Sequence, residues 1–78
     1  MEIIILGTGC AKCQQVYDVV HQVVLNYLPN ATLTKQEDMG EILKYNTLTL
    51  PAIVVNNQVV LKGVVPSQEE VKSLLNIK

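Results

Sequence analysis

The chain opens with a continuous apolar run and then changes to a helical period. Residues 2–6 read EIIIL, rich in β-branched side chains, and Gly7 follows them. Such a run suits an interior strand that is buried on both faces. From residue 11 to residue 28 the apolar positions share one side of a helical wheel, and Pro29 ends the pattern. The apolar side of this predicted helix holds Val16, Val20, Val23, Val24, Tyr27 and Leu28.

The middle of the chain predicts a second strand and a short helix. Residues 31–36 alternate between apolar and polar positions, which indicates a strand. Residues 38–46 then predict a helix with Asp38 as its N-cap and with Ile42 and Leu43 as its apolar anchors. We interpret Glu37, like Asp38, as a helix-capping and solvated residue.

The last third predicts a hairpin and a capped helix. Residues 52–55 and 58–62 are the two strands, and Asn56-Asn57 between them can adopt the positive φ angles of a tight turn. Ser67 and Glu70 form the pattern of a capping box ahead of an apolar helix face. The predicted order of elements is therefore β-α-β-α-β-β-α.

Composition limits the class of protein. The 78 residues are enough for one domain, and 49% hydrophobic with 17% charged residues indicates an ordered globule. The formal net charge of -1 leaves no basic surface for a polyanion, so we expect no nucleic-acid partner. The segment MEIIILG carries an acid where a signal peptide has a base, and its apolar run is too short to span a membrane. We therefore expect a cytoplasmic protein without a membrane partner.

Two cysteines, Cys10 and Cys13, stand between the glycine turn and the first helix in the sequence GTGCAKC. A cysteine at a helix start lies where unpaired N–H groups and the helix dipole favour a thiolate, and Lys12 adds a positive charge nearby. Cys13 falls on the apolar side of the helix and should be more buried. An exposed attacking thiolate and a sheltered second thiol suit disulfide exchange. In a reducing cytosol such a pair is catalytic or metal-binding more often than a permanent cross-link.

The whole chain resembles the thioredoxin-like superfamily, specifically its small glutaredoxin-sized redox-active disulfide proteins of the thioredoxin-3 type. A strand followed by GTGCAKC and a helix, the element order, and the segment TLPAIVV carry the resemblance. It implies a single thioredoxin-like domain over residues 1–78, α/β in class, with a four-stranded mixed sheet and helices on both faces. It also implies a cis peptide at Leu50–Pro51 facing the cysteines, with the Leu50 backbone pairing with a bound substrate chain, and it matches Gly63 to the family's glycine after the last strand.

The sequence departs from the family pattern around the cysteines. Ala11 and Lys12 separate them, Gly9 stands where an aromatic residue usually precedes the first cysteine, and the strand IIIL lacks the buried aspartate of typical thioredoxins. In typical thioredoxins that aspartate shuttles the proton of the second cysteine. Here water or a nearby side chain must therefore take the proton from Cys13.

From the residues and the resemblance together we predict a thiol–disulfide oxidoreductase. Cys10 is the predicted attacking residue and Cys13 the resolving residue, and Gly9, Lys12, Leu50 and Pro51 are the predicted substrate-binding residues. We expect no cofactor and no metal ion, a disulfide-containing protein or small molecule as substrate, and a reductase or small dithiol as electron donor.

A soft-metal module is the alternative. GTGCAKC also resembles the metal-binding loop of ferredoxin-like copper chaperones, and two thiolates can hold Cu(I). Those domains run β-α-β-β-α-β, whereas this chain predicts a helix before the hairpin and another after it. The methionine usual two residues before their first cysteine is Thr8 here.

Overall fold

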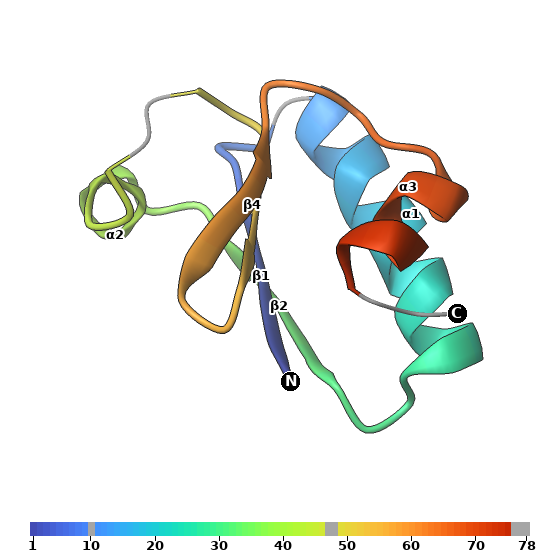
Figure 1. Cartoon of the computed structure of the whole chain (residues 1–78). Coiled ribbons are helices and arrows are strands. Elements are labelled where there is room, and N and C mark those ends of the chain that lie inside the picture. The colour runs from blue at the N-terminus through green and yellow to red at the C-terminus, as the bar shows by residue number, and fades with distance from the viewer. Residues whose placement is uncertain (10, 47–48, 76–78) are drawn as a thin grey trace.

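A computed structural model describes residues 1–9, 11–46 and 49–75 of the chain. Four strands form one mixed sheet in the order β2-β1-β3-β4 (Figure 1). This is the α/β architecture with a four-stranded mixed sheet that the sequence predicts. The elements are β1 (Glu2–Leu6), α1 (Ala11–Tyr27), β2 (Thr32–Gln36), α2 (Met39–Leu43), β3 (Ala52–Val55), β4 (Gln58–Lys62) and α3 (Gln68–Leu74).

The strand pairing brings four chain segments to one end of the sheet. β1 and β2 run parallel, so their carboxyl ends meet, with Leu6 opposite Gln36. β3 runs antiparallel to β1, which places its first residue, Ala52, opposite Leu6 as well. β4 ends beside the same residue, because Lys62 pairs with Ala52. The turn after β1, the loop after β2, the residues before β3 and the residues after β4 therefore lie near one another.

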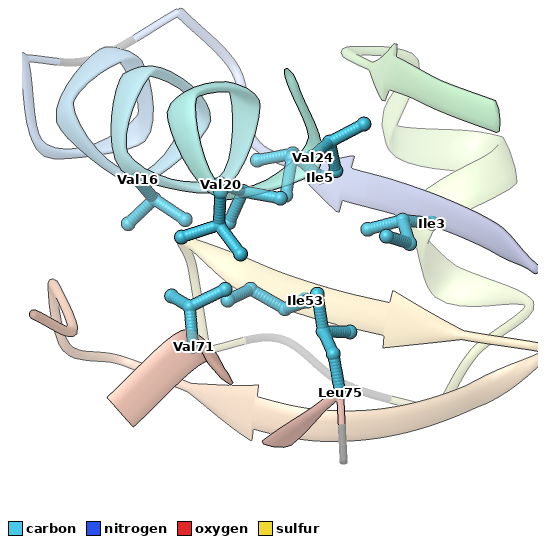
Figure 2. Packing of buried hydrophobic residues seen from close by; sticks show 9 residues of the cluster. Ile3, Ile5, Val16, Val20, Val24, Ile53, Val71 and Leu75 are labelled. Carbon is cyan, nitrogen blue, oxygen red and sulfur yellow. The ribbon is translucent and has the colours of Figure 1, made fainter. Parts of the chain in front are cut away.

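One face of the sheet is covered by α1 and α3, as Figure 1 shows. The central strands present alternate residues to this face, Ile3 and Ile5 from β1 and Ile53 from β3. Figure 2 shows these side chains pointing toward valines of α1 and toward Val71 and Leu75 at the other helix. This cluster is the larger part of the core, and it fixes the orientation of α1 on the sheet.

The opposite face is covered by the short helix α2. Leu6, Ala52 and Val54 form a second buried cluster with Ile42 of α2. The central strands are thus covered on both sides, as their apolar runs predict. The prediction of Leu43 as a second anchor is wrong, since that side chain is 48% exposed. A helix of five residues makes little more than one turn, so Ile42 alone of its residues is buried against the sheet.

Helix α1 follows its predicted faces except at its last residue. Val16, Val20, Val23 and Val24 are buried, and the glutamines and Asp18 of the other side are exposed. Tyr27, predicted on the apolar side, is 46% exposed. Its ring lies instead under the Lys72 ammonium group, with Nζ 4.5 Å from the ring centroid. A cation above the ring face stabilises an aromatic residue at the surface, where the helix runs out.

The predicted caps and turns are confirmed. Asn56 and Asn57 take φ angles of 50° and 69° in the hairpin turn. Asp38 is the N-cap of α2, and its side chain accepts hydrogen bonds from the N–H groups of Gly40 and Glu41. Ser67 and Glu70 form a complete capping box at the start of α3.

Replacing Ser67 by alanine is expected to lower the unfolding free energy by about 1 kcal/mol, because the Glu70 N–H would lose its acceptor. In a domain of this size that corresponds to a fall in Tm of roughly 4–8 °C. Thermal unfolding followed by circular dichroism measures it. Ser73→Ala in the exposed part of α3 is the matched control, and an equal shift in both variants would contradict the cap assignment.

Candidate active site

The predicted site residues gather at the end of the sheet where the four segments meet. Gly9 belongs to the turn after β1, Lys12 and Cys13 to the first turn of α1, and Leu50 and Pro51 to the approach to β3. The connection from β4 to α3 passes over the same end, beside the start of α1 (Figure 1). Cys10 lies outside the described residues. The residues around Cys13 and those around Pro51 are far apart in the sequence, and the antiparallel pairing of β1 with β3 brings them to the same end of the sheet.

Cys13 is the third residue of α1 and is only 5% exposed. This matches the prediction that it lies on the buried side of the helix. Its sulfur is disulfide-bonded in this structure. A buried sulfur at a helix start can be reached by a neighbouring group in the first turn but not by a bulky reagent from solution.

Gly7 lies directly against the Cys13 side chain, a contact that the sequence alone does not predict. A Cβ atom built on Gly7 would stand 2.5 Å from the Cys13 Sγ and 2.7 Å from its Cβ, closer than carbon atoms pack. The Gly7 N–H also donates to the Gln36 carbonyl at 3.0 Å, which extends the β1–β2 pairing by one residue. Gly7 is therefore required for space: it lets the backbone of the sheet contact the cysteine side chain directly.

Gly9 and Lys12 are both at the surface. Gly9 has a φ of 87°, a region that residues with a Cβ rarely adopt, so the turn into α1 favours glycine here. Apart from the Glu37 carboxylate, with Oε2 3.8 Å from a Cβ built on Gly9, the surroundings of this position are open. The Lys12 side chain is exposed in the first turn of α1, where its charge is screened by solvent.

The Leu50–Pro51 peptide bond is cis. Pro51 is buried, and Leu50 packs against the cluster under α2. The Pro51 carbonyl accepts a hydrogen bond of 2.7 Å from the N–H of Gly63. Gly63 has a φ of 79°, and a Cβ there would approach the Thr49 Cγ2 to 2.8 Å. The Gly63 N–H thus ties the end of β4 to the residue before β3 by one hydrogen bond, and Thr49 leaves no room for a side chain at Gly63.

A small pocket of about 20 Å³ opens beside Cys13, enough space for about one water molecule. Its floor is formed by Ile5, Gly7 and Gly9, and α1 contributes Cys13 and Gln14. Two charged residues complete the lining, Lys35 from β2 and Glu37 directly after it. Their presence follows from the parallel pairing of β1 with β2, and alternation in the sequence of β2 did not indicate it.

Lys35 is held in place by α1. Its Nζ donates a 2.8 Å hydrogen bond to the Gln14 Oε1 and lies 4.6 Å from the centroid of the Tyr17 ring. The Gln14 Nε2 in turn donates to Asp18 at 2.9 Å. Lys35 therefore lines the Cys13 pocket while its ammonium group contacts Gln14 and Tyr17 of α1.

The element order argues against the copper-chaperone alternative. Helix α2 lies between β2 and β3, and α3 follows β4, which is not the β-α-β-β-α-β order of those domains.

Within residues 1–9, 11–46 and 49–75, no three His, Cys, Asp or Glu residues come together as metal ligands would. In the same residues no helix has the length and apolarity needed to cross a membrane.

Comparison with known proteins gives the same class as the fold and the site. Residues 1–76 match the family model described as a thioredoxin domain. A protein named thioredoxin from Methanothermobacter thermautotrophicus is 34% identical over 76 residues, covering 97% of this chain and 99% of that protein. A protein named thioredoxin from Methanocaldococcus jannaschii is 37% identical over 71 residues, covering 91% of this chain and 81% of that protein.

The fold and the match to named thioredoxins define a thiol–disulfide oxidoreductase. With a family model matched over nearly its whole length, the chain belongs to the thioredoxin domain family.

Proposed function

We propose that the protein reduces disulfides of proteins or small molecules with Cys10 as the attacking residue and Cys13 as the resolving residue. The single observation that carries the proposal is the burial of Cys13 in the first turn of α1, at 5% exposure, in a thioredoxin fold. A sheltered thiol is poorly placed to meet a substrate from solution. It is well placed to attack a disulfide formed by its neighbour.

The proposed reaction has two steps. The Cys10 thiolate attacks one sulfur of the substrate disulfide, which forms a mixed disulfide and releases the other sulfur as a thiolate. Cys13 then loses its proton and attacks the Cys10 sulfur. The second substrate thiolate leaves. The substrate has then gained two electrons, and the cysteine pair has lost two by forming the Cys10–Cys13 disulfide.

We assign substrate contacts to Gly9, Lys12, Leu50 and Pro51. The open surroundings of Gly9 support a close approach by a substrate backbone. Lys12 is exposed in the first turn of α1, and its charge supports a role in stabilising the attacking thiolate, an effect that solvent screening weakens. Leu50 and Pro51 are proposed to border the bound chain, an assignment supported by their position at the same end of the sheet as Cys13.

Thioredoxins act on disulfide substrates together with a reductase. For this chain we propose a reductase or a small dithiol as the electron donor, since the oxidised pair must regain two electrons in each cycle. We further propose that the protein works in the cytoplasm, where such donors keep thiols reduced.

Titrating the thiols of the purified protein tests the function. We expect two titratable thiols after reduction, none after oxidation, and a reversible two-electron couple in defined dithiol buffers. Metal content is measured in the same preparation. A stoichiometric soft metal without a reversible couple would overturn the oxidoreductase mechanism and favour the metal module.

A further inference from the structure

We infer that Glu37 accepts the proton that the Cys13 thiol loses in the resolving step. The inference rests on the proposed function, because it assigns a base to that step. It concerns the pocket beside Cys13, where the Glu37 carboxylate lies at the surface and the cysteine is buried.

The resolving step needs such a base. A thiolate is the nucleophile, and a thiol taken out of water ionises less readily than one in solution. The strand behind the cysteine offers no carboxylate, since β1 consists of Glu2 followed by Ile3, Ile4, Ile5 and Leu6, and Glu2 pairs at the far end with Thr32. A carboxylate for this step must therefore come from another element that reaches the pocket.

Glu37 is the carboxylate that reaches it. It lines the pocket together with Cys13, and its Oε2 is 3.8 Å from a Cβ built on Gly9. The pocket has space for about one water molecule, so a proton can pass directly or through a single water. The side chain of the neighbouring acid, Asp38, accepts the N-cap hydrogen bonds of α2. Glu37 forms no part of that cap.

The other groups around the pocket are compatible with this role. Lys35 is the second charged residue of the lining, and its ammonium group hydrogen-bonds to Gln14 and not to Glu37. The lining residues from β1 and its turn are uncharged, and the one from α1 beside Cys13 is neutral Gln14. Asp18 of α1 hydrogen-bonds to Gln14, and Lys12 points to solvent.

The step balances. The S–H bond of Cys13 breaks and its proton moves to the Glu37 carboxylate. The Cys13 thiolate forms the new S–S bond with Cys10 as the Cys10–substrate S–S bond breaks, and the substrate leaves as a thiolate. Glu37 then returns its proton to the solvent that it faces, or to the leaving thiolate.

Stopped-flow mixing of the reduced protein with dithiobis(nitrobenzoate) tests the inference. The first nitrothiobenzoate released reports attack by Cys10, and the second reports resolution by Cys13. In Glu37→Gln we expect an unchanged first phase and a second phase slowed roughly 100-fold at neutral pH. The slowing should shrink as the pH rises, because hydroxide then removes the Cys13 proton and the Glu37 carboxylate is no longer needed. Glu37→Asp should recover part of the rate, and Glu69→Gln, an exposed glutamate of α3, is the matched control.

Two results would overturn the role of Glu37. One is a second phase that equals the wild type at every pH. The other is a slowing that stays constant up to high pH, which indicates a change of structure and not the loss of a base. If the wild type itself releases only one equivalent, the proposed function fails, and with it the step that Glu37 is inferred to serve.

Discussion

Replacing Cys10 by serine is expected to abolish disulfide reduction. The remaining cysteine is 5% exposed, so it has no access to a substrate disulfide in solution. Turnover of dithiobis(nitrobenzoate) with a dithiol as donor should fall to the rate of the donor alone. Activity that survives intact in this variant would show that Cys10 is not the attacking residue.

Replacing Cys13 by serine is expected to stop the reaction at a different point. The first step should proceed at the wild-type rate, with one nitrothiobenzoate released, and the protein should gain the mass of the other as a stable mixed disulfide. The two variants therefore separate attack from resolution, and each is the control for the other. A Cys13→Ser protein that releases two equivalents would contradict the assignment of the resolving role.

Local patterns in the sequence were enough for the elements and most of the core. The apolar run of residues 2–6 predicted a strand covered on both faces, because all of its interior positions are hydrophobic. The Asn56-Asn57 turn and the Ser67 cap could be predicted because their geometry depends on residues three or fewer positions apart. The prediction that Leu43 is buried failed, because a helix of five residues buries only Ile42 of its apolar side.

The site could be predicted only in part, because two of its residues depend on contacts between distant segments. Cys13 and Pro51 carry their own signals, a C-x-x-C motif and a proline before an apolar strand. Gly7 has to be a glycine because the Cys13 sulfur packs against it. That contact depends on how α1 is oriented on the sheet, which local sequence does not give. Glu37 reaches the pocket because β2 pairs in parallel with β1, and local sequence does not encode that pairing, so the sequence alone predicts only a helix-capping and solvated residue there.

Replacing Gly7 by alanine is expected to lower both stability and the rate of resolution. The new Cβ would stand 2.5 Å from the Cys13 Sγ, so the cysteine or the strand must move. Overpacking of this kind costs about 1–3 kcal/mol of unfolding free energy, measured by denaturant titration. A displacement of reacting atoms approaching 1 Å slows a reaction by up to about 100-fold. The second phase of nitrothiobenzoate release should slow accordingly, and the first phase should not.

The pH profile separates this effect from the loss of a base. Displacement of the sulfur acts on the thiolate as much as on the thiol, so the slowing in Gly7→Ala should persist at high pH, whereas that in Glu37→Gln should disappear. Gly40→Ala in α2 is the matched control: its Cβ would meet only the Asp38 Oδ1 at 3.1 Å, and we expect a stability change of less than about 1 kcal/mol with both phases unchanged. A Gly7→Ala protein that resolves at the wild-type rate would contradict a positioning role, because the contact with Cys13 would then be dispensable for the reaction.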